Sequence, residues 1–329
     1  MLLVSGDIAR RTGGNLYDRH IARACRRAGL PLRVVSTGST AEAHALLARV
    51  SPRVIVIDSI AIPIAAPLIS WMRRTLRARV VLLMHMPTTA HGTHAALRWA
   101  DRVVAVSADL ASRAARAGAP RSRISVIPPG RDGIPRVARR ARDARDGHLR
   151  VLSVANWSPA KGIATLVAAA ARLPEVHLDL VGDVGSGAHR DAVMARIRSD
   201  GLRSRVVLHG VLAEQQLARR YAEADVFALP TEREGYGTVF AEALSHGLPI
   251  IAADIAPVRQ IVGDAGLFVP PRRVRPLASA LRLMTDAWLR RRVARAARAR
   301  GRALPTWAMS ERAFIALLRR EMRMAVGRA

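Results

Sequence analysis

The sequence predicts an α/β protein of two domains, each built on a parallel sheet with helices on both faces. Short apolar runs typical of buried strands alternate with helical stretches along the whole chain. Residues 128–133, Pro-Pro-Gly-Arg-Asp-Gly, interrupt this alternation, and an Arg- and Asp-rich stretch without apolar periodicity follows. The length of 329 residues also suggests about two domains.

The first domain is expected over residues 1–133. Its predicted strands occupy residues 2–5, 32–36, 54–58, 80–85, 102–106 and 124–127. Helices are expected between them, for example over 17–28 and 41–50. Residues 54–72 are apolar enough to imitate a membrane span, but they contain Asp58 and two prolines. We therefore expect a strand, a loop and the start of a helix there.

The second domain is expected over residues 149–302, after a linker at 134–148. Its predicted strands occupy residues 151–155, 177–181, 206–209, 226–229, 250–252 and 267–269. Helices are expected to start near Gly162, His189, Leu217, Thr238 and Pro257. Residues 276–302 are predicted to be helical. The last segment, 303–329, is expected to form a helix over 310–324.

The charge of the chain is strongly positive, at +28 from 53 basic and 25 acidic residues, and it is spread through both halves. Nucleic acid, an anionic membrane surface or an anionic substrate would suit such a chain. Nucleic acid suits it least, because no nucleic-acid-binding motif is visible and aromatic residues are not interleaved with the arginines. One cysteine, Cys25, excludes an internal disulfide, and no signal peptide is visible. A cytoplasmic protein is expected.

The most informative stretch is 225–254, which predicts a strand, a glycine-rich turn, a helix and a second strand. Gly235 and Gly237 allow close approach of the backbone to a ligand, and Thr238 begins the helix. The free N–H groups and positive dipole end of that helix suit an anion such as phosphate. Glu234 and Glu242 flank this position and would hold neutral hydroxyls of a sugar and a ribose on either side of a diphosphate.

The pattern Glu234-x7-Glu242, with the turn Gly235-Tyr236-Gly237-Thr238, resembles the donor-site signature of the retaining GT-B glycosyltransferases of family 4. This resemblance implies two Rossmann-like domains that face an interdomain cleft, with the acceptor side in 1–133 and the donor side in 149–302. It also implies that 303–329 packs back on the first domain. The donor-binding residues implied here include Val239 in the helix and Val211, whose loop would border the nucleotide base.

Lys161 is the only lysine among 53 basic residues, and it lies between a predicted strand and a predicted helix. Because every other cationic position has arginine, the lysine at position 161 indicates that a compact point charge is needed at this position. The resemblance places this lysine on the donor diphosphate, while the alternative is a surface lysine without function. Asn156 stands where the family usually has an arginine, so that phosphate contact would be a hydrogen bond without charge.

Two features of the first domain are further candidates. Gly13 and Gly14 precede a helix and could allow close approach to phosphate or sugar, or form an ordinary turn. His85 ends a predicted strand, where the resemblance implies a contact with the transferred sugar; the alternative is a histidine that caps the strand. His85, His91 and His94 do not have the spacing of a standard metal site, and no Asp-x-Asp is present. No metal or other cofactor is expected.

The resemblance implies transfer of a sugar from a nucleotide diphosphate, UDP or GDP, to an acceptor hydroxyl with retention of configuration. No carboxylate pair suited to double displacement is identifiable, so a front-side path assisted by Lys161 is expected. Glu234, Lys161 and His85 would be the catalytic residues, and the acceptor could be a glycan, a lipid-linked or a small molecule. Other enzymes of the fold, such as an epimerase or a phosphorylase, and a non-enzymatic binder of anionic surfaces are the alternatives.

A membrane contact is a separate expectation, which would add peripheral association with the inner face of the membrane to a cytoplasmic location. Trp71 and Met72 lie beside four arginines, and these could form a membrane-facing or anionic-acceptor patch or a plain solvated helix face. The four are Arg73, Arg74, Arg77 and Arg79.

Overall fold

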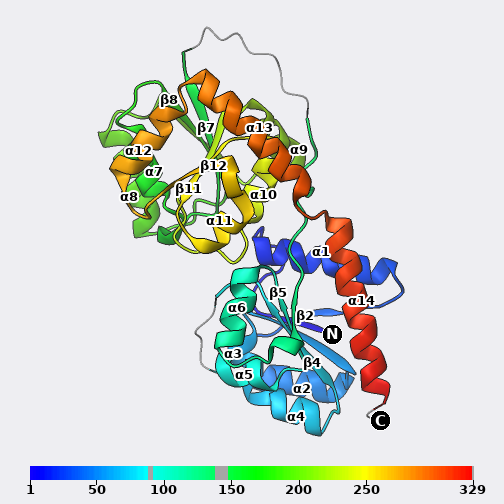
Figure 1. Cartoon of the computed structure of the whole chain (residues 1–329). Helices are drawn as coiled ribbons and strands as arrows, with labels where there is room; N and C mark the ends of the chain where they lie inside the picture. Colours follow the sequence, from blue (N-terminus) through cyan, green and yellow to red (C-terminus); the bar gives the residue numbers. More distant parts are fainter. Residues whose placement is uncertain (88–91, 138–146, 328–329) are drawn as a thin grey trace. The chain divides into compact units, whose positions relative to one another are not determined.

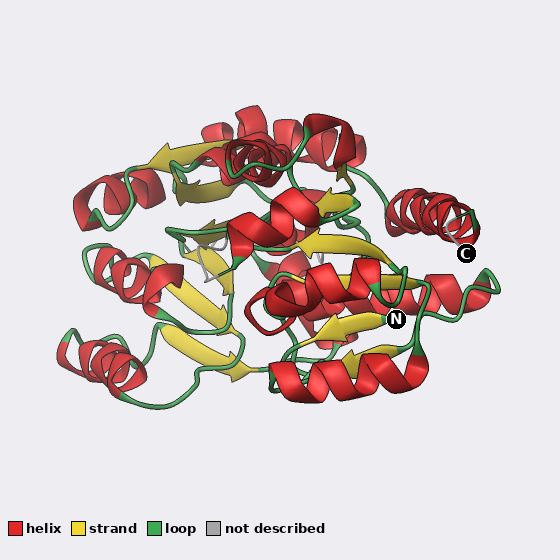
Figure 2. Cartoon of the chain, turned by 90° about the horizontal axis from the view of Figure 1, so that it is seen from below, coloured by secondary structure: helices red, strands yellow, loops and turns green. Residues whose placement is uncertain are grey.

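The computed structural model describes residues 1–87, 92–137 and 147–327 (Figure 1). It divides into two compact units, Met1–Gly130 with Pro305–Ala329, and Arg131–Leu304. Each unit contains a six-stranded parallel sheet, and Figure 2 shows strands flanked by helices. The predicted α/β class is confirmed. Of the expected linker, residues 138–146 lie outside the described residues.

The N-terminal unit has the strand order β2-β1-β3-β4-β5-β6, with all pairs parallel. Its strands are β1 (Leu2–Val4), β2 (Val34–Ser36), β3 (Val54–Asp58), β4 (Arg79–Met84), β5 (Arg102–Ala105) and β6 (Ile124–Val126). Every residue of β3 and β4 is buried, as expected for central strands covered on both faces. The chain proceeds outward from β1 in both directions, so the strand order reverses between β1 and β3.

Several helices of this unit begin directly after a side chain that caps them. Thr12 accepts a hydrogen bond from the N–H of Asn15, and Ser39 and Ser107 cap their helices in the same way. The helices are α1 (Gly13–Arg27), α2 (Thr40–Val50), α3 (Ile62–Ala65), α4 (Ile69–Arg74), α5 (Thr93–Trp99) and α6 (Ala108–Arg116). Helix α1 thus starts at Gly13 and not at residue 17. Gly13 and Gly14 are its first two residues, and the separate turn expected there was wrong.

Helix α14 (Trp307–Val326) belongs to the N-terminal unit and packs against α1, as the red and blue helices of Figure 1 show. Glu321 on α14 is fully buried and pairs with Arg79 of β4 and Arg102 of β5. Arg79 is therefore part of an internal ion network. The expectation that Arg79 belongs to a surface patch was wrong, because a buried partner on α14 neutralises its charge.

The C-terminal unit has the strand order β12-β11-β10-β7-β8-β9, again all parallel. Its strands are β7 (Leu149–Val154), β8 (Val176–Val181), β9 (Val206–Gly210), β10 (Val226–Leu229), β11 (Ile250–Ala253) and β12 (Gly266–Val269). Its helices are α7 (Ile163–Ala170), α8 (Ala188–Ser199), α9 (Glu214–Glu223), α10 (Thr238–Ser245), α11 (Ala256–Val262), α12 (Val274–Leu283) and α13 (Ala287–Ala303). The strand order reverses between β7 and β10.

The stretch predicted to be helical over 276–302 forms two helices, α12 and α13, with a break between them. Asp286 caps α13 by accepting hydrogen bonds from the N–H groups of Trp288 and Leu289, and this cap favours a new helix start. Helix α9 begins at Glu214, three residues before the expected start. Among the described helices, none is long and apolar enough to cross a membrane.

Candidate donor site and a buried carboxylate–histidine cluster

The loops that carry Lys161 and Glu234 leave two neighbouring strands at the point where the strand order of the C-terminal sheet reverses. Strand β7 leads to Asn156 and Lys161, and β10, which pairs with β7, leads to Glu234. Open parallel sheets bind ligands outside the carboxyl ends of the strands at such a switch point. The topology therefore places these residues where a ligand is expected.

Lys161 and Glu234 form an ion pair, with 2.5 Å between Nζ and Oε1. The exposed fraction of the Lys161 side chain is 27% and that of Glu234 is 8%. The two loops are also joined through the carbonyl of Ala160, which accepts hydrogen bonds from the Thr231 hydroxyl and the Glu232 N–H. Gly162 allows this close approach: its φ is +71°, and an added Cβ would lie 2.4 Å from the carbonyl oxygen of Pro230.

The turn after Glu234 leads directly into α10. Gly237 has φ +96° and precedes Thr238, the first residue of the helix. An added Cβ on Gly237 would lie 2.7 Å from the ring of Phe240, so only glycine fits without movement. The free N–H groups at the start of α10 and the ammonium of Lys161 provide positive charge at the two loops, which suits an anionic group.

Tyr236 and Glu242 point into the interior of the unit. The Tyr236 hydroxyl is buried and has no hydrogen-bond partner within the described ranges, and burial raises its pKa. The carboxylate of Glu242 accepts a hydrogen bond of 2.9 Å from the Tyr221 hydroxyl, and Glu242 is only 4% exposed. Burial, and then the charge of Glu242, raise the pKa of Tyr221 well above its ordinary value. Contact of Glu242 with a ribose stays a prediction.

The other expected donor contacts lie on neighbouring loops of the same unit. Asn156 accepts a hydrogen bond of 3.1 Å from the N–H of Asp183, and so holds the loop that follows β8. Gly235 is buried in the turn, whereas Val239 is half-buried in the first turn of α10. Val211 follows β9, the edge strand of the sheet, and is 55% exposed.

A hollow lined by arginines lies at the other end of α10. It borders Ser245, the last residue of the helix, which is roughly 10 Å from Thr238 at the usual rise per residue. Its cationic lining residues are Arg131, Arg136, Arg298 and Arg302. The hollow is therefore separate from the turn that holds Glu234.

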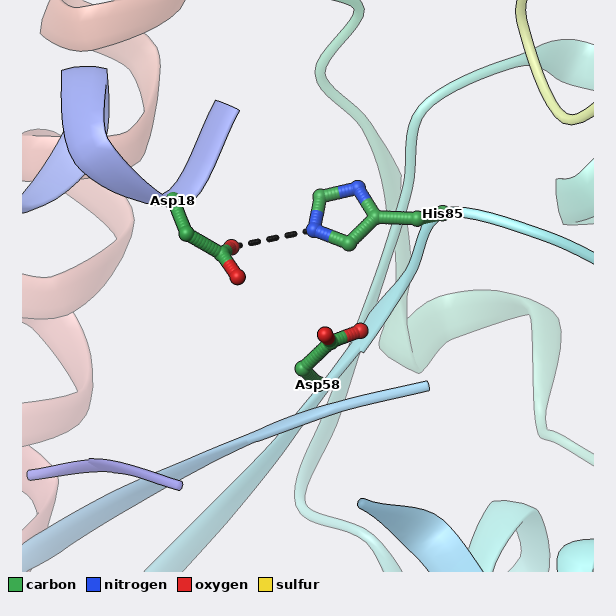
Figure 3. A group of neighbouring side chains, drawn as sticks. All are labelled: Asp18, Asp58 and His85. Atoms are coloured by element: carbon green, nitrogen blue, oxygen red, sulfur yellow. Dashed lines mark hydrogen bonds and ion pairs between the residues drawn. The ribbon is translucent and has the colours of Figure 1, made fainter. Parts of the chain in front are cut away.

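In the N-terminal unit, His85 lies in a buried cluster with Asp18 and Asp58 (Figure 3). The Nε2 atom of His85 is 3.0 Å from Oδ1 of Asp18. Gly14 packs on the ring, since an added Cβ there would lie 3.3 Å from Cδ2 of His85. The structure thus brings the predicted residues Gly14 and His85 into contact. Gly13 lies one residue earlier in the first turn of α1.

The charges in this cluster depend on one another. Burial opposes the charged form of His85, but the charge of Asp18, its hydrogen bond and the charge of Asp58 together raise the pKa of His85. Burial raises the pKa of Asp58, although the charge of His85 acts in the opposite direction. These three side chains could also hold a divalent cation, because one ligand atom from each lies within 4.8 Å of the others. Of the histidine set considered above, His94 is exposed and His91 lies outside the described residues.

Asp18 and Asp58 were missed by the sequence analysis. Asp58 ends the otherwise apolar strand Val-Ile-Val-Ile-Asp, and Asp18 lies on the face of α1 that also buries Tyr17 and Ile21. A carboxylate on a buried face was the available signal, since such groups are rarely buried without a partner.

Comparisons with known proteins concern the family and the fold of the chain. Residues 148–286 match the family model described as glycosyl transferases group 1, and residues 8–132 match that of glycosyltransferase family 4. The chain is 34% identical over 199 residues to the D-inositol 3-phosphate glycosyltransferase of Nocardia farcinica, covering 55% of this chain and 44% of that protein. It is 30% identical over 159 residues to the alpha-D-kanosaminyltransferase of Streptomyces kanamyceticus, covering 47% and 41%. The chain spans a little under half the length of the curated relatives it matches.

Solved structures share the fold over nearly the whole chain. Sucrose-phosphate synthase of Thermosynechococcus elongatus has a TM-score of 0.82 at 22% identity, covering 97% of this chain and 98% of that one. HepE of Anabaena, solved with UDP and glucose, has a TM-score of 0.76 at 20% identity, with 96% and 98% covered. These similarities show the two-domain GT-B fold. Since each half also matches a family model of its own, the chain belongs to the group 1, family 4 glycosyltransferases.

Proposed function

We propose that the protein is a retaining glycosyltransferase that moves a sugar from a nucleoside diphosphate, UDP or GDP, to an acceptor hydroxyl. The observation that carries this proposal is the ion pair of Lys161 and Glu234 at the switch point beside the N-terminus of α10. A cation and free N–H groups suit the diphosphate, and the adjacent carboxylate suits sugar hydroxyls. HepE, which has the same fold, was solved with UDP-glucose, and this supports a donor of that class.

In the proposed reaction the bond from the anomeric carbon to the diphosphate oxygen breaks, and the acceptor oxygen bonds to the same face of the sugar. The acceptor proton passes to the departing phosphate. The Lys161 ammonium and the N–H groups at Thr238 stabilise the negative charge that grows on that phosphate. Glu234 holds the sugar hydroxyls, Glu242 the ribose, and His85 keeps its proposed contact with the transferred sugar.

We propose that this reaction needs no metal ion, because Lys161 and the start of α10 supply the positive charge that a cation would otherwise supply. The phosphorylase alternative requires a neutral lysine amine that forms an imine with a cofactor. In this structure the Lys161 amine is instead paired with the Glu234 carboxylate, and the loop that carries it lies at the donor turn. An epimerase would use the same donor, and only the product distinguishes it.

The positive charge of the chain suits an anionic acceptor or membrane surface, and we propose an acceptor of the glycan, lipid-linked or small-molecule class.

Thermal unfolding with UDP, GDP, ADP and their sugar conjugates, in the presence of EDTA, tests the donor proposal. A nucleotide at ~100 times its dissociation constant should stabilise the unit that binds it by about 2.7 kcal/mol. Glu234→Gln should remove most of the stabilisation by the sugar conjugate relative to the free nucleotide. Glu232→Gln is the matched control, because Glu232 lies two residues away and pairs with Arg272 instead.

A folded wild-type protein that no nucleotide stabilises would contradict the proposal. Stabilisation that depends on a divalent cation would contradict only its metal-independent part. Release of a nucleoside diphosphate together with a glycosylated acceptor would separate a transferase from an epimerase.

A further inference from the structure

The buried cluster of Asp18, Asp58 and His85 occupies the switch point of the N-terminal sheet. The strand order reverses between β1 and β3; α1, which carries Asp18, follows β1, and Asp58 ends β3. His85 follows β4, the next strand. Their exposed fractions are 0%, 2% and 7%, so three ionisable groups share one buried position.

The hydrogen bonds of the cluster leave one oxygen of Asp18 unsatisfied. Oδ1 of Asp18 is 3.0 Å from Nε2 of His85, while Oδ2 is buried and has no partner in the part of the chain that the structure describes. Oδ1 of Asp58 accepts hydrogen bonds from the Ser59 hydroxyl and the Ile60 N–H. A buried carboxylate oxygen without a donor is costly, and two buried carboxylates this close do not both ionise readily.

We propose that Asp18 and Asp58 are positioning residues that hold His85 as an imidazolium with a defined free N–H. Asp18 is the ionised carboxylate that accepts from Nε2–H. Asp58 is a neutral carboxylic acid whose proton is directed at Oδ2 of Asp18. Nδ1–H of His85 is then a donor for a ligand oxygen. The arrangement of the three side chains does not depend on the proposed function. Only the assignment of the ligand oxygen to the sugar donor rests on it.

Charge balance and orientation support this assignment. One carboxylate, one imidazolium and one neutral acid leave the buried cluster without net charge, which is the least costly arrangement in a low dielectric. Burial also raises the pKa of Asp58, which favours its neutral form. In Figure 3 both carboxyl groups lie on the Nε2 and Cδ2 side of the ring, and Nδ1 points away from them.

The remaining neighbours fix the ring without adding charge. The Tyr17 ring meets the His85 ring edge-on at 5.1 Å, and the Tyr17 hydroxyl donates to the carbonyl of Ile127. The backbone N–H of His85 donates to the Ser59 hydroxyl, and Gly14 contacts the ring. The ionisable carboxyl groups that face His85 from α1 and β3, in the described structure, are thus Asp18 and Asp58.

Nuclear magnetic resonance of protein with ¹⁵N-labelled histidine, without any nucleotide sugar, tests the proposal. In the wild type the His85 ring should titrate above its ordinary pKa of about 6.5. Asp58→Asn, which resembles the neutral acid, should leave this titration nearly unchanged. In Asp18→Asn the midpoint of the His85 titration should lie more than one pH unit below 6.5. Asp179→Asn removes the carboxylate that lies 2.6 Å from Nε2 of His209 in the other unit, so it is the control and should leave the His85 titration unchanged.

Three results would overturn the proposal: an unshifted His85 in Asp18→Asn, a loss in Asp58→Asn as large as in Asp18→Asn, or perturbation of the His85 signal by one equivalent of Zn²⁺. The last would indicate a metal site. If Asp18→Asn does not fold, the infrared carbonyl band of a buried carboxylic acid at neutral pH decides, because Asp58→Asn must abolish it. All these measurements are independent of sugar transfer, so an inactive protein would leave their outcome intact.

Discussion

The buried ion network on α14 allows a quantitative prediction for the variant Glu321→Gln. The Glu321 carboxylate accepts hydrogen bonds from Nε and Nη2 of Arg79, at 2.8 and 2.5 Å, and from Nε of Arg102 at 2.9 Å. Glutamine preserves the shape of the side chain but removes its charge, which leaves two guanidinium groups with less compensation. Arg79 retains a second partner, Asp101, at 3.0 Å.

The expected cost follows from this geometry. Removing one partner of a buried ion pair costs about 3–5 kcal/mol. Because Asp101 remains and the Arg102 side chain is 15% exposed, we expect the lower end, ~3 kcal/mol. In a unit of this size each kcal/mol shifts the melting temperature by ~2–4 °C, so the N-terminal unit should melt about 6–12 °C lower.

Calorimetry and thiol labelling measure this effect. Cys25 is the single cysteine and is fully buried in the same unit, so its labelling in native buffer reports opening of that unit. A loss of ~3 kcal/mol should accelerate labelling by about 100-fold if labelling requires unfolding. Glu311→Gln on the same helix is the calorimetric control, because its partners Arg27 and His20 are 68% and 25% exposed and partly solvated pairs contribute ~0–1 kcal/mol. Equal melting temperatures for the two variants would refute the reasoning.

Three further predictions concern the sites. Lys161→Met should lower the rate of sugar transfer by about 10²–10³-fold, because the charge that stabilises the departing phosphate is lost. Arg272→Met, the control, should leave the rate unchanged. Equal rates of the two variants in steady-state assays would exclude Lys161 from the mechanism. Gly162→Ala should destabilise the C-terminal unit and weaken nucleotide binding, because the new Cβ meets the Pro230 carbonyl. Gly185→Ala is the control: its φ is +64° and no atom lies near the new Cβ, so it should cost only the backbone strain of ~1–2 kcal/mol. Thermal unfolding compares the two variants. The contribution of His85 to the stability of the N-terminal unit should fall as pH rises above ~6.5, since its raised pKa adds stability that is complete below its unfolded value and lost as pH passes the folded value. The raised pKa of Asp58 acts in the same direction from lower pH. Burial lowers the pKa of the Met1 α-amino group to about 6, which acts in the opposite direction, so chemical denaturation compares the wild type with His85→Gln. A difference in stability between the two that grows from about pH 6.5 to 9 would contradict this account.

Strands and the donor turn were predictable because their signals are local. Val226–Leu229 is an apolar run ended by Pro230, and α10 starts at Thr238 directly after a glycine, so β10 and α10 have the predicted bounds. Central parallel strands, which are buried on both faces, have short continuous apolar sequences. The twelve strands of the described residues occur where the sequence indicates them. Helix starts were less certain, because α1 and α13 begin at capping side chains that need no apolar periodicity.

The sequence by itself determined the α/β class, the strand positions and the residue types of the donor turn, since apolar periodicity and backbone permissiveness act over a few residues. Only the tertiary structure decided which charges meet. Lys161 joins Glu234 across 73 residues, His85 joins Asp18 across 67, and Arg79 joins Glu321 across 242. Whether a charged side chain is solvated, paired or neutralised depends on the partner that the fold brings to it, and that partner is far away in sequence.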